Sequence, residues 1–236
     1  MNKVLFFAAL IFLSSHGAVA QNSNECLADV LAYNKKIADL GKPKEGKVYS
    51  MDYRQEIKYW DASTTAVDMR VKYYVTHNQV HSISDQLKTY MDDDYVFTII
   101  EARKQIVVTR NPKDEVSPNA MQNFLKNQKL ILGKCSVQEC SMDKEKGTKK
   151  IVLDATKTGI KGFFGEKLTY YFDAKGNLKK TVTTYSRGYT IRRMSITINS
   201  MNFSSSYKFP TKLYDMFLDA KGKLKSKYSG YQLINE

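Results

Sequence analysis

The stretch from Val48 to Trp60, VYSMDYRQEIKYW, alternates between apolar and polar side chains. Its odd-numbered positions are apolar apart from Gln55, and its even-numbered positions from Ser50 to Lys58 are polar. After a turn at 61–65 the alternation resumes over 67–75. Alternation with a period of two is typical of antiparallel strands that have one apolar and one solvated face. The stretch therefore predicts a β-sheet whose apolar face has to be covered by other parts of the chain.

Two helical patterns interrupt this strand pattern. Residues 24–40 place apolar side chains mostly at helical spacing, and Gly41 with Pro43 ends that helix. A second helix is predicted from its N-cap Ser117 to Gly133, with a proline at its first position. Further strands are predicted at 79–90, 95–101, 104–110, 149–155, 166–172, 178–186, 190–199, 212–219 and 226–234, and a polar loop at 141–150.

This order of elements predicts an α+β fold. The sheet is expected to be a curved antiparallel half-barrel, covered by the N-terminal helix and the mid-chain helix. We expect residues 21–236 to form a single domain, because a chain of about this length buries roughly 70% of its unfolded surface and so has a core of useful size.

The first twenty residues have the layout of a secretory signal peptide. Lys3 precedes the apolar run 4–13, and Ala18-Val-Ala20 fits the small-x-small cleavage rule. The run is shorter than the roughly 20 residues of a membrane-spanning helix. No lipobox precedes Cys26. We therefore expect residues 1–20 to be removed and the mature, unacylated chain to be periplasmic or secreted.

The cysteines are expected to meet an oxidising environment after export. Cys135 and Cys140 enclose only Ser-Val-Gln-Glu and form the candidate disulfide. Cys26 lies close to the apolar side of the first helix and is expected to be a buried free thiol.

Motifs that would indicate catalysis or metal binding are either absent from the sequence or explained by its turns and strands. Residues 90–93 spell YMDD, the metal-binding tetrad of reverse transcriptases, but an exported chain of this length lacks the polymerase subdomains, and 92–94 has ordinary turn composition. His77 and His81 lie about 13 Å apart in a strand, too far for one metal ion, and are expected at the surface. Nucleophile elbows and phosphate loops are absent from the sequence. The sequence therefore predicts no enzyme, cofactor, metal or nucleic-acid site.

The apolar face of the early strands is rich in methionine and tyrosine. Methionine adapts to irregular ligands, and tyrosine joins an apolar ring to a polar tip. Two interpretations stay open: the helices fill the curve of the sheet as plain core, or the face binds acyl chains beneath a helical lid. The candidate lipid-binding residues are Tyr49, Met51, Tyr53, Ile57, Tyr59, Val67, Met69, Val71 and Tyr73, with Met121, Phe124 and Leu125 on the lid.

Three stretches carry a resemblance to a known family. They are 95–112, YVFTIIEARKQIVVTRNP; 168–180, LTYYFDAKGNLKK; and 225–235, KSKYSGYQLIN. In hairpin style and element order the chain resembles the LolA/LolB-like periplasmic outer-membrane lipoprotein carriers. The resemblance implies a lipid- or lipoprotein-binding transport role in the periplasm. None of the family's functional residues can be matched to positions of this chain.

The charge of the chain bears on its partners. Its net charge is +13, with lysines scattered over predicted strands and turns. The scatter is typical of a solvated basic surface, and the excess favours anionic surfaces such as lipid headgroups. The expected partners are lipid or lipoprotein acyl chains and an anionic membrane surface, and the protein is expected to be a monomer. The alternative is a secreted β-rich interaction module that binds a protein or an acidic glycan.

Overall fold

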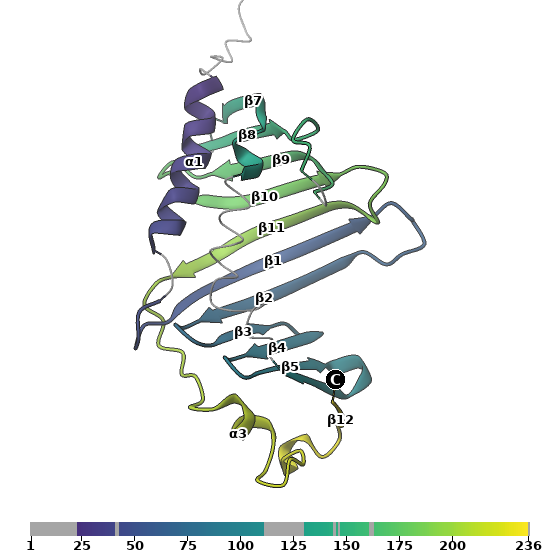
Figure 1. The fold of residues 1–236 in the computed structure, drawn as a ribbon. Coiled ribbons are helices and arrows are strands. Elements are labelled where there is room, and N and C mark those ends of the chain that lie inside the picture. The colour runs from purple at the N-terminus through teal and green to yellow at the C-terminus, as the bar shows by residue number, and fades with distance from the viewer. Residues whose placement is uncertain are drawn as a thin grey trace, which may run out of the picture.

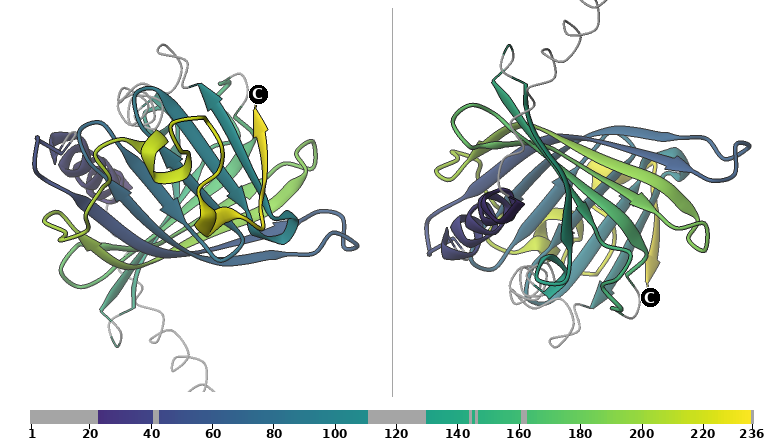
Figure 2. Two further views of the ribbon diagram at one scale, coloured as in Figure 1. Left: turned by 90° about the horizontal axis from the view of Figure 1, so that it is seen from below. Right: turned by 90° about the horizontal axis from the view of Figure 1, so that it is seen from above.

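A single open sheet forms the centre of the molecule (Figure 1). The sheet is curved, and different segments of the chain cover its two faces (Figure 2). All neighbouring strands are antiparallel except β12 and β6. The predicted α+β class with a curved antiparallel sheet and covering helices is confirmed. The computed structural model describes residues 23–40, 43–110, 130–143, 145, 147–160 and 163–235.

Twelve strands make up the sheet, in the order β12-β6-β5-β4-β3-β2-β1-β11-β10-β9-β8-β7. Most neighbours are consecutive in the chain, and the β1–β11 and β12–β6 pairs join distant segments. The strands are β1 (Tyr49–Tyr59), β2 (Val67–Val75), β3 (Val80–Ile83), β4 (Leu87–Met91), β5 (Tyr95–Ile100), β6 (Gln105–Arg110), β7 (Ser136–Asp143), β8 (Thr148–Asp154), β9 (Gly165–Phe172), β10 (Leu178–Tyr185), β11 (Ile191–Asn202) and β12 (Gln232–Asn235).

The β1–β2 hairpin follows the alternation of its sequence. Its polar side chains form ion pairs on one face: Arg54 Nε donates to Asp68 Oδ1 over 2.7 Å, and Arg70 Nε donates to Asp52 Oδ1 over 2.9 Å. These pairs hold the pKa of both carboxyls below its usual range, mainly through the hydrogen bonds from the arginines. The apolar side chains of the hairpin therefore share the other face.

Helix α1 (Ser23–Leu40) packs against one end of that apolar face. Residues directly opposite in antiparallel strands share a face, and the register leads from Tyr170 on β9 through Thr181 and Ile196 to Gln55 on β1. The helix therefore covers the same face that carries the methionines and tyrosines of β1, which we call the inner face. Its buried cluster consists of Cys26, Val30, Leu132, Ile151, Leu153, Ala155, Leu168, Tyr170 and Phe172.

A second cluster lies on the opposite, outer face at the other end of the sheet. Tyr90 on β4 is opposite His81 on β3, and His81 is opposite Tyr74, which alternates with the inner-face Tyr73 on β2. Helix α3 (Leu213–Phe217) covers this end. The buried residues of the outer cluster are Tyr90, Phe97, Ile99, Ile106, Val108, Leu213, Phe217 and Leu218.

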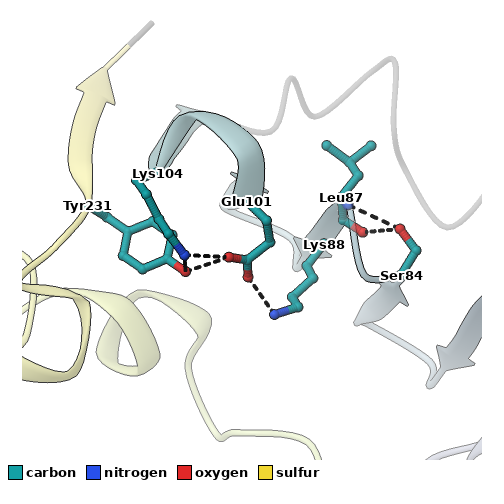
Figure 3. Close-up of polar contacts among 6 residues, drawn as sticks. All are labelled: Ser84, Leu87, Lys88, Glu101, Lys104 and Tyr231. Atoms are coloured by element: carbon teal, nitrogen blue, oxygen red, sulfur yellow. Dashed lines mark hydrogen bonds and ion pairs between the residues drawn. The ribbon is translucent and has the colours of Figure 1, made fainter.

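The C-terminal segment returns along this end and adds the last strand. After α3 it forms the short 3-10 helix η2 (Ser226–Tyr228), and β12 then pairs in parallel with β6. Glu101, at the start of the 3-10 helix η1 (Glu101–Arg103), fixes the segment in place. Its carboxylate accepts hydrogen bonds from Lys88 Nζ at 2.6 Å and from Tyr231 Oη at 2.7 Å (Figure 3). These two bonds, assisted by Lys104, lower the pKa of Glu101 to about 2.

Several predicted strands have a different structure. The strand predicted at 79–90 is two strands, because Ser84 Oγ donates to the carbonyl of Leu87 at 2.9 Å and accepts from its N–H at 3.1 Å, which closes a turn (Figure 3). The strand predicted at 212–219 is α3, in which Leu213 and Phe217 are four residues apart and buried together.

Two further boundaries differ from the sequence prediction. The segment 226–234 is η2 followed by β12. The polar loop predicted at 141–150 is mostly strand, shared between β7 and β8. Lys150 Nζ pairs with Glu139 Oε2 at 2.8 Å, and Lys149, on the other face, pairs with Asp29 of α1. Polar composition indicated a loop, whereas the residues form a sheet edge with charged side chains.

The predicted mid-chain helix is described only at its end. Residues 130–132 are helical, and Leu132 is buried in the cluster beneath α1. The proposed signal peptide and the lid residues Met121, Phe124 and Leu125 lie outside the described residues.

The cysteine pairing differs from the prediction. Cys26 on α1 forms a disulfide with Cys140 on β7, with a Cα–Cα distance of 6.3 Å, and Cys135 is the free thiol. Five residues of nearly extended chain separate the Cα atoms of Cys135 and Cys140 by roughly 16 Å, beyond the about 7 Å that a disulfide spans. Burial raises the pKa of the Cys135 thiol to about 11, and its Sγ donates to the carbonyl of Ile131 at 3.2 Å. The prediction of a buried Cys26 is confirmed, and that of its free thiol is wrong.

Candidate functional site: the inner face of the central strands

The predicted lipid-binding residues of β1 and β2 lie together on the inner face. They form cross-strand rows in which Met51 is opposite Tyr73, and Tyr53 is opposite Val71. Ile57 is opposite Val67 in the last of these rows. The alternating pattern thus placed this set on one face, where it adjoins the part of the sheet that α1 covers.

Strand β11 extends the same surface and was missed as a contributor. Its side chains complete the rows: Met201 is opposite Met51, and Met194 is opposite Ile57. The sequence signal is hidden because β11 contains two register shifts, at Asn199 and at Arg192, and each changes the parity of the apolar positions. The inner-face residues contributed by β11 are Ile191, Met194, Ile196, Ile198 and Met201.

The burial of this surface differs from that of the cluster beneath α1. Of the nine predicted residues on β1 and β2, only Val71 is fully buried, and the others are partly exposed. In the α1 cluster, Ile151 and Leu153 are completely inaccessible. The central part of the inner face is therefore apolar surface that the described residues do not close over.

Two phenols give this apolar surface a polar component. Burial raises the pKa of Tyr53 and of Tyr73, and the proximity of the Tyr53 phenolate raises the pKa of Tyr73 further. Both groups therefore stay neutral at physiological pH and can donate a hydrogen bond. On β1, two residues after Tyr53, Gln55 Nε2 lies 3.6 Å from Met194 Sδ on β11, a weak acceptor that leaves the amide open to a better partner.

Tyr49 and Tyr59, the first and last residues of β1, lie at the two ends of this inner-face surface. Tyr49 packs edge-on against Phe203, with ring centroids 5.2 Å apart. Tyr59 is opposite Ile191, at the end where β1 leaves the sheet. The candidate surface thus spans the full length of β1.

The first aspartate of the YMDD string, Asp92, has a structural role. Asp92 Oδ1 accepts from the backbone N–H of Asp94 at 3.0 Å and of Tyr95 at 2.8 Å, which closes the β4–β5 turn. Its Oδ2 accepts from the N–H of Leu213 at 3.1 Å and so ties α3 to that turn. The predicted hairpin turn is confirmed, and Asp92 also contributes to the docking of the C-terminal segment.

The histidine prediction is half wrong. His77 is exposed, whereas His81 is fully buried on the outer face beneath the chain that leads to α3. Aromatic rings pack around its imidazole. The apolar periodicity of the sequence could not reveal these contacts, because two of the rings come from a distant segment. Within the described ranges, no group of three or more His, Cys, Asp or Glu side chains is placed to hold a metal ion. In the same ranges, no helix is long and apolar enough to cross a membrane.

Comparisons with known proteins place the architecture among solved structures. The chain is similar to an uncharacterized conserved protein from Thermus thermophilus, with 9% identity, a TM-score of 0.41, and 92% of this chain and 100% of that chain covered. It is similar to a LolA superfamily protein from Nitrosomonas europaea, with 9% identity, a TM-score of 0.31 and coverages of 81% and 96%. A third likeness is to a domain described as an outer membrane lipoprotein-sorting protein from Vibrio parahaemolyticus, with 12% identity, a TM-score of 0.31 and coverages of 79% and 95%.

The likeness is one of fold. No protein-family model and no curated protein sequence matches the chain. The function proposed below is therefore drawn from the residues of this chain.

Proposed function

We propose that this protein is an exported, non-enzymatic carrier or binding protein for the acyl chains of lipids or lipoproteins. The acyl chains lie on the inner face of β1, β2 and β11. The observation that carries the proposal is the band of partly exposed methionines and tyrosines beyond the part of the face that α1 covers.

The chemistry of the band suits a flexible apolar ligand. Met51, Met69 and Met194 supply unbranched side chains that adapt to different chain lengths and bends. Tyr53 and Tyr73 supply flat apolar rings, and their neutral hydroxyls are hydrogen-bond donors for an ester or amide carbonyl at the head of the chain. Apolar contacts provide the affinity, and the phenols orient the ligand.

A titration with an environment-sensitive labelled fatty acid tests the proposal. We expect saturable binding by the wild type and roughly tenfold weaker binding by the double variant Met51→Gln/Met69→Gln, because it removes apolar contact worth about 1.5 kcal/mol. Glutamine preserves side-chain length, so the sheet is expected to remain folded, and circular dichroism checks this. If the double variant unfolds, Met69→Gln alone serves.

The matched control is Lys58→Gln/Lys72→Gln. Both lysines are exposed on the outer face of the same two strands, and the variant introduces the same new side chains. Its affinity should equal that of the wild type. Failure of the wild type to bind, or equal affinity in the methionine variant and the control, contradicts the proposal and leaves an interaction module with a filled core as the better account.

A further inference from the structure

A patch of aromatic and basic side chains, all exposed except the half-buried Tyr189, lies at one end of the sheet, outside the inner face. We call it the Trp60 patch; its members are Trp60, Phe164, Arg187, Tyr189 and Arg192. The β1–β2 and β10–β11 connections project together from this end (Figure 1). The chain contains a single tryptophan, and it lies here.

Backbone and ring contacts hold the patch together. Trp60 Nε1 donates to the carbonyl of Ser186 at 3.1 Å, and the Trp60 N–H donates to the carbonyl of Thr190 at 3.2 Å. The Ser186 N–H donates to the carbonyl of Phe164 at 3.0 Å. Phe164 stacks on Tyr189 with ring centroids 5.1 Å apart. Three segments distant in the sequence therefore present one fixed surface.

The aromatic rings of the patch are only partly covered. Trp60 is 37% exposed and Phe164 is 44% exposed, which places both among the exposed large apolar side chains of the described residues. A buried tryptophan usually donates its indole N–H to a hydrogen-bond partner. Trp60 makes this hydrogen bond with the backbone, although its ring is partly exposed. Among the described residues, the outward side of the Trp60 ring is approached by two arginines.

Two arginines supply the charge of the patch. The guanidinium groups of Arg187 and Arg192 lie 5.5 Å from the centre of the Trp60 ring, and both residues are exposed. Within the described ranges neither guanidinium forms an ion pair with a carboxylate. The adjacent Asp61 is engaged in its own turn, where it accepts from the Ser63 N–H at 2.8 Å. The planar forks of the arginines are therefore free to bind phosphate oxygens.

We propose that the Trp60 patch docks the protein on an anionic phospholipid surface. Tryptophan, tyrosine and arginine on one rigid tip match the membrane interface, where amphipathic rings lie at headgroup level and arginine binds phosphate. The net charge of +13 adds long-range attraction to an anionic bilayer. A stable protein interface needs about 800 Å² on each partner, from 20–30 residues, which is far more than the five side chains of the patch. The docking does not depend on ligand binding at the inner face.

The native Trp60 fluorescence tests this proposal directly. The protein is expressed with its own leader, and its intact mass is measured first, because an unprocessed apolar leader would bind vesicles by itself. Vesicles of phosphatidylcholine with phosphatidylglycerol are compared with vesicles of phosphatidylcholine alone. We expect a blue shift of the tryptophan emission with the anionic vesicles only, quenching by brominated acyl chains, and reversal by high salt.

Two double variants separate the patch from the overall charge. Arg187→Gln/Arg192→Gln should bind anionic vesicles roughly ten- to thirtyfold more weakly in a sedimentation assay. Lys47→Gln/Lys208→Gln makes the same charge change away from the patch, just before β1 and in the segment between β11 and α3, and it should lose much less affinity. The thermal midpoints of both variants show whether they are folded. If the arginine variant does not fold, Arg187→Gln alone replaces it.

Three results would overturn the proposal. The first is the absence of binding to anionic vesicles at low salt. The second is binding without a change in Trp60 emission, or with equal losses in the two double variants, since either shows that the patch is not the contact. The third is a Trp60 shift produced by heparin but not by vesicles, which assigns the patch to an acidic glycan. Loss of fatty-acid binding by the methionine variant, with vesicle binding intact, keeps this proposal separate from the function proposed above.

Discussion

The imidazole of His81 is fully buried on the outer face, among the rings of Tyr90, Tyr207 and Phe209. Its Nδ1 lies 2.9 Å from the Tyr207 hydroxyl, while Nε2 is buried without a hydrogen-bond partner among the described residues. Protonation of both ring nitrogens would therefore put an unsolvated charge into an aromatic pocket. Burial accordingly lowers the pKa of His81 to about 4, and the attraction of Asp92 offsets only part of this.

This environment predicts a specific pH dependence of stability. The unfolded chain protonates His81 near pH 6.5, whereas the folded chain does so only near pH 4. Between these values the unfolded state binds more protons, so the free energy of unfolding is fully retained above pH 6.5 and falls as the pH drops towards 4. The loss from this group amounts to roughly 3 kcal/mol. Urea denaturation at several pH values measures it.

Two histidine variants isolate the effect from the titration of carboxylates. His81→Asn removes the titrating group while keeping a hydrogen-bonding atom near Tyr207, and we expect a smaller slope of stability against pH between 6.5 and 4. His77→Asn changes an exposed histidine a few residues away and should keep the wild-type slope. Parallel curves for the wild type and His81→Asn would show that the imidazole has the same pKa in the folded and unfolded states, which contradicts the prediction.

At the scale of elements, the helix α1 is joined to the sheet covalently. The Cys26–Cys140 disulfide links residues 114 apart in sequence, and it lies in the cluster that Val30 and Ile151 complete. Closing a loop of this length restricts the unfolded chain strongly. The disulfide thus fixes the helix at one end of the inner face and leaves the central strands uncovered by it.

The disulfide predicts the outcome of two cysteine variants. Cys26→Ser/Cys140→Ser should lose up to about 4–5 kcal/mol of stability in the loop-closure model, with a clear fall in the thermal midpoint. Cys135→Ser removes only a half-buried thiol and should change the midpoint little. Alkylation of the unfolded, unreduced protein should modify Cys135 alone. Labelling of Cys26 or Cys140 instead would contradict the pairing.

The sequence predicts elements well where local periodicity is regular. Strands β1 and β2 alternate with Gln55 as the exception, so both their structure and their common face follow from the residues alone. Helix α3 has only five residues, too few to establish a period, and its start depends on Asp92, which is far away in the chain. The β12 strand likewise depends on the Glu101–Tyr231 contact, which no local pattern encodes.

The candidate site is predictable only in part for the same reason. Its β1 and β2 residues follow from alternation, whereas the register shifts at Asn199 and Arg192 hide the share of β11. The disulfide could not be read from cysteine spacing, because the path of α1 decides it. The Trp60 patch joins three connections, and only the pairing of β1 with β11 and of β9 with β10 brings them together.

At the scale of the whole molecule, one curved sheet serves both proposals. Strand β1 carries Met51 and Tyr53 on the inner face and ends beside Trp60. The outer cluster lies on the face opposite the methionines, over β4, β5 and β6. There the hydrogen bond between Tyr231 and Glu101 holds the C-terminal segment against the sheet. Docking through the Trp60 patch would therefore bring one end of the acyl-binding face to the headgroup level of a bilayer.

Native mass spectrometry of the protein, purified from its host without detergent or organic solvent, tests the central claim most directly. We predict adducts with the mass of acyl lipids that are lost on denaturation in methanol. The stripped protein should take up one labelled fatty acid or lipopeptide, and Met51→Gln/Met69→Gln should take up much less than Lys58→Gln/Lys72→Gln. A protein that carries no lipid and takes up none after stripping would contradict the account.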